Sequence, residues 1–364
     1  MEKMEGVRPS RAMSMNWDFY RGKKVLLTGH TGFKGTWMSV CLVNHGAEVI
    51  GYSSCAKTEE RLFDICGIQE QITHIKGDVR ELDHLKAVFS AYQPEIVFHL
   101  AAQPIVRTSY DDPVGTYSTN VMGTVNVLEC VRLNPCVRSF VNVTTDKVYE
   151  NKEGERSYSE NDPLDGFDPY SNSKSCSELV THAYQRSFFA GGYPAISTAR
   201  AGNVIGGGDF AKDRIIPDCV RAALQGEDII VRNPYSVRPY QHVLEAIFAY
   251  LMIGAKQYED GRYAGYYNVG PDDEDCFETG RLVDTFIRHW GEGLRRIDRY
   301  DGGPHEANRL KLDCARLKST FGWQPRWDVE TAIEKVVAWS KCYRAGGDVR
   351  MCMNRQIQEY LEAQ

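Results

Sequence analysis

The stretch Thr28-Gly29-His30-Thr31-Gly32-Phe33-Lys34-Gly35 joins a short apolar run, 24–28, to an amphipathic run near 35–45. Glycine at 29 permits a tight turn, Gly32 lets the backbone approach a pyrophosphate, and Gly35 lets a helix pack close to a sheet. A helix N-terminus there adds backbone N–H groups and partial positive charge. An isolated glycine triplet is more often an ordinary turn, but the flanking strand and helix favour a dinucleotide-binding site.

Short apolar runs alternate with helical patterns beyond this stretch. The runs that indicate buried strands are 48–52, 96–100, 140–144, 195–199 and 265–269, and helical periodicity appears near 81–92, 114–133, 170–190, 281–290 and 329–345. Strands alternating with helices favour a parallel, doubly wound sheet. We therefore expect an α/β fold with a smaller, mixed α/β lobe. Its expected parts are a lead-in (1–16), a cofactor-binding lobe (17–200 with 240–275) and a substrate-binding lobe (201–239 with 276–364).

Composition narrows the functional class. The 364 residues are 42% hydrophobic and 25% charged, close to average globular usage, and show no membrane-spanning run. A net charge of -6, without basic residues interleaved with aromatic ones, argues against a nucleic-acid partner. The 11 cysteines include no Cys-x-x-Cys pair, which favours reduced thiols over disulfides or a metal site. The first 16 residues lack the apolar core of a secretory signal, so we expect a cytoplasmic protein.

Tyr170 and Lys174 are candidates for a catalytic pair. They stand four residues apart after Pro169, which fits the first turn of a helix, so both side chains share one face. An ordinary phenol is a poor base at neutral pH, whereas a neighbouring ammonium and a positively charged cofactor would stabilise the phenolate. The spacing is common by chance, but its place downstream of the glycine-rich turn favours a role in oxidising a hydroxyl group.

Thr144-Thr145-Asp146-Lys147 follows the apolar run 140–144, where the carboxyl end of a parallel strand faces the ligand crevice. A carboxyl group in a dry crevice can be held protonated and can then act as a general acid. The alternative for Asp146 is a solvated carboxylate or a helix cap. We expect Asp146 to be the acid because Tyr170 and Lys174 accompany it.

Together these motifs resemble the extended short-chain dehydrogenases, and among them the CDP-glucose 4,6-dehydratases. The spacing Gly-x-x-Gly-x-x-Gly and the set Thr145, Tyr170 and Lys174 carry the first likeness. Lys147 carries the second, because dTDP-glucose dehydratases have Glu at that place. The runs 200–214, 231–243, 304–306 and 311–313 extend the resemblance from about Trp17 to near the C-terminus.

The resemblance implies an NAD-dependent lyase that converts CDP-glucose to CDP-4-keto-6-deoxyglucose and water in deoxysugar biosynthesis. Thr145 would bind the C4 hydroxyl, Tyr170 would take its proton, and Asp146 would protonate the departing C6 hydroxyl. Lys147 would either take the C5 proton or stabilise the enolate. The alternatives are a nucleotide-sugar C4 epimerase, against which Asp146 argues, and a catalytically silent NAD-binding regulator, against which the intact catalytic set argues.

The resemblance also implies ligand contacts. For the cofactor these are Gly29, Thr31, Gly32, Phe33, Lys34, Gly35, Asp78, Val79, Leu100, Ala101, Ala102, Gln103, Thr119, Tyr170 and Lys174. For the substrate they are Gln103, Arg107, Asn203, Arg214, Ile216, Pro217, Arg232, Arg238, His242 and His305.

Arginines suit a diphosphate because guanidinium binds phosphate in a bidentate way, although many surface arginines touch no ligand. The run 48–54 ends without an acidic residue for the ribose, and Lys34 is nearby, so charge alone leaves NADP open. The resemblance favours NAD. It also implies a homodimer packed through helices near 114–133 and 170–190, with further pairing into a tetramer left open.

Overall fold

The computed structural model describes residues 15–54, 60–152, 154, 156–291, 293–299 and 310–363. At its centre lies a seven-stranded sheet in the order β10-β6-β5-β4-β1-β2-β3, and all six pairings are parallel. The strands are β1 (Lys24–Thr28), β2 (Glu48–Ser53), β3 (Thr73–Lys76), β4 (Ile96–His99), β5 (Ser139–Thr145), β6 (Ala195–Ala201) and β10 (Tyr266–Val269). The predicted doubly wound parallel sheet is confirmed.

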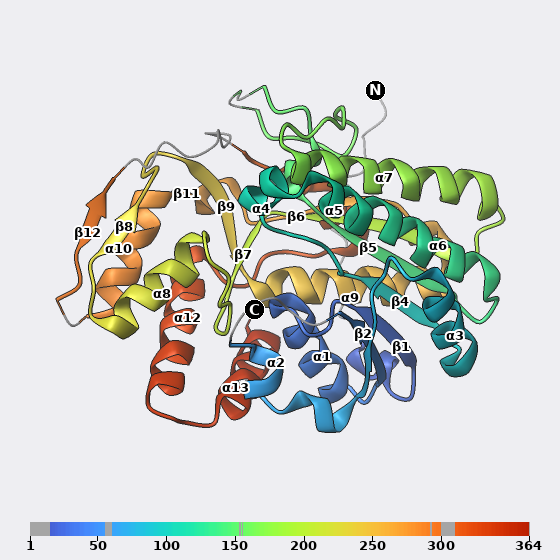
Figure 1. The fold of residues 1–364 in the computed structure, drawn as a ribbon, viewed down its shortest axis with the longest axis horizontal. Coiled ribbons are helices and arrows are strands. Elements are labelled where there is room, and N and C mark those ends of the chain that lie inside the picture. Colours follow the sequence, from blue (N-terminus) through green and yellow to red (C-terminus); the bar gives the residue numbers. More distant parts are fainter. Residues whose placement is uncertain are drawn as a thin grey trace, which may run out of the picture.

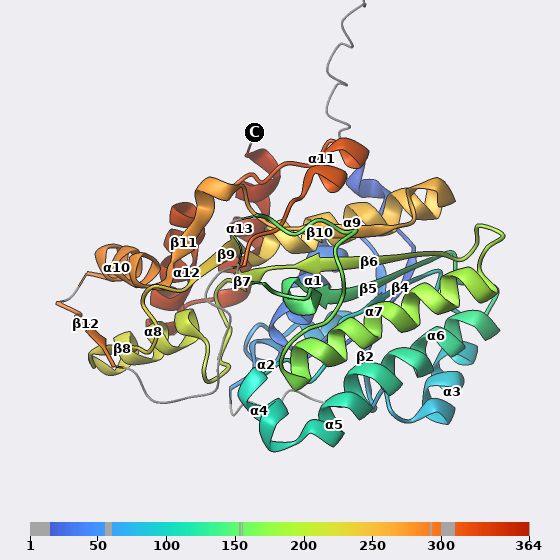
Figure 2. The same ribbon diagram turned by 90° about the horizontal axis from the view of Figure 1, so that it is seen from above.

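Helices cover both faces of this sheet (Figures 1 and 2). One face carries α3 (Leu82–Tyr92), α6 (Gly123–Leu133) and α7 (Pro169–Phe188), and the other carries α1 (Phe33–Asn44) and α9 (Val243–Glu259). Nearly every residue of α9 is buried, because this helix lies between the sheet and the C-terminal helix α13 (Val349–Glu362). Phe248 of α9 stacks on Tyr360 of α13 with ring centroids 4.9 Å apart.

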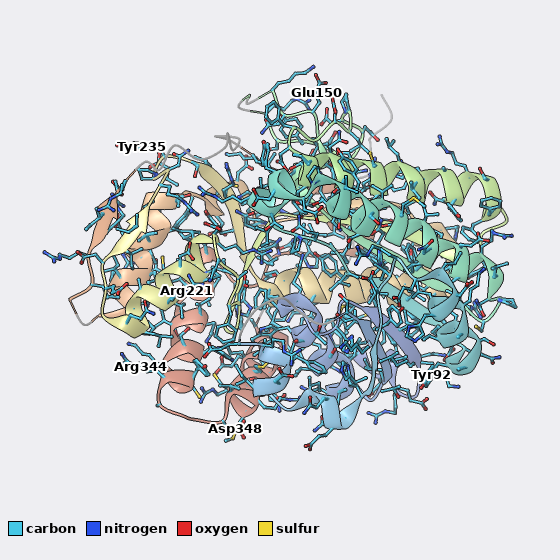
Figure 3. The ribbon with its side chains drawn as sticks, in the orientation of Figure 1. Tyr92, Glu150, Arg221, Tyr235, Arg344 and Asp348 are labelled. Atoms are coloured by element: carbon cyan, nitrogen blue, oxygen red, sulfur yellow. The ribbon has the colours of Figure 1, made fainter. Side chains whose placement is uncertain are left out.

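A smaller lobe lies beside the carboxyl ends of the central strands (Figure 1). It holds a three-stranded sheet of β11 (Cys276–Glu278), β9 (Val237–His242) and β7 (Asn203–Ile205), and a pair of β12 (Arg296–Asp298) and β8 (Ile229–Val231). Helices α8 (Ile215–Gln225), α10 (Thr279–Trp290) and α12 (Val329–Arg344) enclose a separate apolar core. Figure 3 shows Arg221 and Tyr235 in this lobe and Tyr92 at the far end of the larger one.

The remaining helices are short: α2 (Leu62–Ile65), α4 (Val106–Asp111), α5 (Pro113–Tyr117) and α11 (Ala315–Phe321). The single helix expected near 114–133 is divided into α5, a π-helical turn (Ser118–Met122) and α6. Side chains of α11 and α13 join the core of the larger lobe, and α12 adds Trp339 to it. The division of the chain into lobes by residue number stays a proposal. Among the described residues, the helices are too short or too polar to cross a membrane.

Candidate active site

A cavity of about 590 Å³ lies between the carboxyl ends of the large sheet and the smaller lobe. Thr145, Lys147 and Tyr170 line it from the sheet side. The predicted substrate residues that line it are Arg107, Asn203, Arg214, Ile216, Pro217, Arg232 and Arg238. The fold therefore brings these catalytic and substrate-binding candidates, distant in sequence, to one space.

The glycine-rich turn sits where the strand order reverses, between β1 and β4, which is the ligand-binding point of open parallel sheets. Gly29 has a φ of +74°, and a Cβ there would lie 2.8 Å from the Ala101 nitrogen. A Cβ at Gly35 would overlap the Gly29 carbonyl oxygen. A Cβ at Gly32 would meet only that same oxygen, at 3.3 Å, within 4 Å. The turn thus leaves room for a phosphate at Gly32 and at the start of α1, which fits a dinucleotide.

The neighbouring cofactor candidates are held by local bonds. The Leu100 and Ala101 amides donate to the Thr28 hydroxyl at 3.1 and 3.2 Å. The Thr31 hydroxyl lies 2.8 Å from that of Ser53, and no carboxylate follows within the described end of β2. The Asp78 carboxylate accepts bonds from Arg80, while Val79 is buried against Gly123. Thr119 lies in the π-helical turn, and Phe33 begins α1.

Gln103 is placed differently. Its amide nitrogen donates to the Thr116 hydroxyl at 2.9 Å and to the Ile105 carbonyl at 3.1 Å. Its backbone N–H donates to Asn120 at 2.8 Å, so the side chain stabilises the loop after β4. It does not line the cavity. Its expected ligand contacts, like those of Ala102 just before it, stay predictions.

Tyr170 and Lys174 occupy the first two turns of α7. Asp168 caps this helix by accepting from the Ser171 amide at 2.9 Å, which fixes where the turn bearing Tyr170 begins. The Lys174 ammonium donates to the Val143 carbonyl at 3.1 Å, and burial lowers the pKa of Lys174 to about 8. Burial raises the pKa of Tyr170 to about 12, although a hydrogen bond with Thr145 opposes this rise. The phenol therefore needs a further positive charge to ionise at neutral pH.

Asp146 begins a short helical turn directly after β5 and is 1% exposed. Its Oδ1 accepts from the Thr145 hydroxyl at 3.0 Å, whereas its Oδ2 has no hydrogen-bond partner among the described residues. Burial raises the pKa of Asp146 despite the nearby Lys147 charge. The site thus combines a hydroxyl, a phenol, a lysine and a carboxyl group whose pKa is raised by burial.

The cavity also contains carboxylates that the sequence analysis did not single out. Asp213 places its Oδ1 2.7 Å from Arg232 and 3.8 Å from Arg107, so it connects the two sides of the cavity. Its φ of +61° is unusual for a residue with a Cβ. Asp209 binds Arg214 at 3.0 Å. Such pairing depends on tertiary structure. The one signal for it in the sequence is that the run 209–214 contains both Asp and Arg.

Two substrate candidates lie elsewhere. His242 is fully buried, with its ring between Trp37 and Trp327 at 5.9 and 4.9 Å, and it caps α9 by accepting from the Leu244 amide. We therefore do not retain it as a substrate contact. His305 lies outside the described residues. Within the described part of the chain, no cluster of three or more His, Cys, Asp or Glu side chains could hold a metal ion.

Comparison with known proteins places this site in context. The family model described as GDP-mannose 4,6 dehydratase matches residues 26–336. A CDP-glucose 4,6-dehydratase from Salmonella typhimurium is 44% identical over 355 residues, which cover 95% of this chain and 98% of that protein. A dTDP-glucose 4,6-dehydratase from Haemophilus influenzae is 26% identical and covers 86% and 97% of the two chains.

Solved structures share the fold. DesIV, a dTDP-glucose 4,6-dehydratase from Streptomyces venezuelae with NAD bound, superposes with a TM-score of 0.76 at 22% identity, over 89% of this chain and 98% of that one. A UDP-glucose 4-epimerase from Thermotoga maritima gives a TM-score of 0.75 at 19% identity, over 88% and 99%. The family-model match and the 44% identity over nearly the whole chain show that this protein belongs to the family of nucleotide-sugar 4,6-dehydratases.

Proposed function

We propose that this protein is a CDP-glucose 4,6-dehydratase that converts CDP-glucose to CDP-4-keto-6-deoxyglucose and water. The observation that carries the proposal is the buried carboxyl group of Asp146, whose Oδ2 lies beside Thr145 and Tyr170 and has no partner in the described part of the chain. A proton donor at this point is what loss of a sugar hydroxyl requires. The 44% identity to a CDP-glucose 4,6-dehydratase supports the choice of nucleotide.

NAD is the proposed cofactor, and when bound it would accept a hydride from C4 of the sugar and return it to C6. The turn at Gly29, Gly32 and Gly35 and the start of α1 would hold its pyrophosphate. Lys34 lines the cavity where this turn meets the substrate side. The NAD bound in DesIV, which has the same fold, supports this proposal.

The side chains of this chain would act in sequence on the sugar. Thr145 would hydrogen-bond the C4 hydroxyl while Tyr170 takes its proton, and Lys174 would stabilise the resulting phenolate electrostatically. Oxidation at C4 acidifies the C5 proton, which then leaves to a base. Asp146 would next protonate the C6 hydroxyl so that it departs as water. Lys147 lines the cavity beside Asp146, and it would either accept the C5 proton or stabilise the enolate.

The arginines of the cavity would bind the diphosphate in place of the carboxylates that they now contact. Arg107, Arg232 and Arg214 each lie beside a carboxylate, from Asp213 or Asp209. A diphosphate carries more charge than one carboxylate and accepts bidentate bonds, so it would replace these partners on entering. Asn203, Ile216, Pro217 and Arg238 line the same space and would complete the nucleotide site.

We also propose a homodimer formed through the helices near 114–133 and 170–190. These helices expose a set of large apolar side chains: Val114 (79% exposed), Met122 (52%), Leu133 (47%), Leu179 (51%) and Phe188 (54%). Such exposed groups are typical of an interface. Sedimentation that shows a monomer would refute the dimer.

The ten described cysteines are all free, which supports the reducing cytoplasm as the location.

The deciding experiment offers the purified protein CDP-glucose and, separately, dTDP-, UDP- and GDP-linked sugars. Products are followed by the alkaline absorbance of 4-keto sugars and by mass. We expect loss of one water from CDP-glucose. A conversion without change of mass would instead indicate the epimerase activity of the Thermotoga maritima neighbour, and no conversion of any sugar would contradict an enzymatic function.

A further inference from the structure

Glu178 is a buried carboxylate that the proposed reaction does not use. It lies on α7 four residues after Lys174, so the two side chains share one face of the helix. Its side chain is fully buried. A charged group without water is retained only where other charges and hydrogen bonds compensate for its lost hydration.

Glu178 contacts residues of three elements, β5, β6 and its own helix α7, beside the proposed catalytic residues. Its Oε1 accepts a short hydrogen bond from the Thr144 hydroxyl, at the end of β5. Its Oε2 accepts from Thr198 at 2.7 Å and from Arg200 at 2.9 Å, both on β6, and lies 3.3 Å from His182 on α7. Thr144 directly precedes Thr145 and Asp146, so this carboxylate ties α7 to the strand end that carries both groups.

Glu178 is the negatively charged group that raises the pKa of the Lys174 ammonium. Besides Glu178, the described groups that interact electrostatically with Lys174 are His99 on β4 and Lys34 on α1, and Tyr170 stands four residues before it on the same helix. Burial and Lys174 lower the pKa of His99 to about 3, so it is neutral, and Lys34 can only repel. Burial alone would raise the pKa of Glu178, but Arg200, His182 and Thr144 together lower it to about 2. Glu178 therefore stays charged and favours the ammonium form of Lys174.

The negative charge of Glu178 also pairs with Arg200, which is likewise fully buried. Its guanidinium donates to Tyr149 at 3.0 Å and to the Glu160 carbonyl at 3.1 Å as well as to Glu178. Tyr149, Tyr266 and Glu160 are the other titratable groups facing this pair among the described residues, besides His182. The Glu178 carboxylate thus stabilises two buried positive charges. It contacts Arg200 directly, and it acts on Lys174 electrostatically.

We propose that Glu178 is a positioning residue for the catalytic set: it keeps Lys174 protonated and fixes the end of β5 that presents Thr145 and Asp146. The inference rests on the proposed function, because the turnover of CDP-glucose reports it. It assigns Glu178 an effect through Lys174 and Thr144 and no contact with substrate.

The test is the pH dependence of kcat for Glu178→Gln, measured with NAD saturating. Loss of the negative charge should lower the pKa of Lys174, so the alkaline limb should move to lower pH by about 1 unit or more. The value of kcat near pH 8 should fall by about fivefold or more, because the pKa of Lys174 is about 8, while KM changes little. Glu160→Gln is the matched control, because it removes a buried carboxylate of the same network and should leave the limb in place.

Two further variants keep the test decisive if Glu178→Gln does not fold with Arg200 unpaired. The double variant Glu178→Gln, Arg200→Met removes both buried charges and should show the same shifted limb. Thr144→Val removes a contact but keeps the charge, so it should lower kcat without moving the limb. An unshifted limb in the folded double variant, or a shifted limb in Thr144→Val, would overturn the inference. If the natural protein does not convert CDP-glucose, the proposed function fails first.

Discussion

Replacing Asp146 by Asn separates the two halves of the proposed reaction. The amide oxygen can keep the 3.0 Å bond from Thr145, and the amide nitrogen takes the place of an oxygen that has no partner among the described residues. The change therefore leaves the packing intact, but it removes the exchangeable acidic proton. Thr145, Tyr170 and Lys174 remain, so oxidation at C4 should continue.

We expect the loss of water from the Asp146→Asn variant to slow by about 10²- to 10⁴-fold, the usual contribution of a general acid, or about 3 to 5 kcal/mol of barrier. Rapid mixing with CDP-glucose should still show the absorbance of reduced cofactor, and mass analysis in heavy water should show deuterium at C5 without loss of water. Asp284→Asn, an exposed change outside the cavity, serves as the control. Full turnover by the Asp146→Asn variant would refute the role of this carboxyl group.

The same substitution should also change stability with pH. Because burial raises the pKa of Asp146 in the folded chain, the unfolded chain releases this proton at lower pH, and the natural protein loses stability as pH rises between the two values. The Asn variant lacks this loss. Urea unfolding should therefore find the variant more stable than the natural protein at pH 7, with the difference shrinking toward pH 4.

Three other changes test separate parts of the structure. Tyr170→Phe should lower kcat by about 10²- to 10⁴-fold and, unlike Asp146→Asn, abolish the absorbance of reduced cofactor on mixing with substrate. Gly35→Ala should abolish NAD binding in calorimetry and lower Tm, because the added Cβ overlaps the Gly29 carbonyl; unchanged NAD affinity would contradict the proposed phosphate site. Burial raises the pKa of Glu245 to about 7. Its contribution to the free energy of unfolding should therefore fall as pH rises from about 4.3 through about 7. Glu245→Gln should remove that part of the pH dependence measured by urea unfolding.

The central sheet could be predicted because its strands carry a strong local signal. β1, β4, β5 and β6 are buried on both faces, so apolar residues cluster in each of them beside a helical pattern, although β5 and β6 also contain Ser, Thr, Asn or Arg. β3 was not predicted, since its four residues alternate between partly buried and exposed at the sheet edge. The strands of the smaller lobe are mostly three residues long, too short for periodicity to reveal.

Helix α9 shows the opposite difficulty. Its residues are apolar around the whole circumference, and a helix pattern is recognised chiefly by one polar face. The structure supplies the reason, because the sheet covers one side of α9 and α13 covers the other. Glu245 is one of its few polar residues, and it accepts bonds from the Trp327 amide at 2.8 Å and the Tyr360 hydroxyl at 2.8 Å. That pairing joins segments more than 80 residues apart and leaves no trace in local sequence.

At the site, residues within one motif could be identified from spacing, whereas pairings between motifs could not. Tyr170 and Lys174 share a helix face because four residues make about one turn. In contrast, the approach of Asp213 to Arg107 depends on how α4 and the start of α8 meet across the cavity. His242 shows the converse case: the resemblance implied a ligand contact, whereas the structure packs its ring between two tryptophans in the core.

The polar groups of the cavity are arranged at the expense of folding stability. Asp146 keeps a buried oxygen that has no partner among the described residues, Lys34 lies half-buried beside the like charges of Lys174 and Arg214, and Asp213 holds a left-handed backbone conformation. Each feature is unfavourable in the free chain, and a bound sugar nucleotide and cofactor would give Asp146 a partner and place negative charge beside Lys34. A tightly bound nucleotide should therefore stabilise this protein beyond what simple contact area implies, because binding also reduces the repulsion around Lys34 and satisfies the buried oxygen of Asp146.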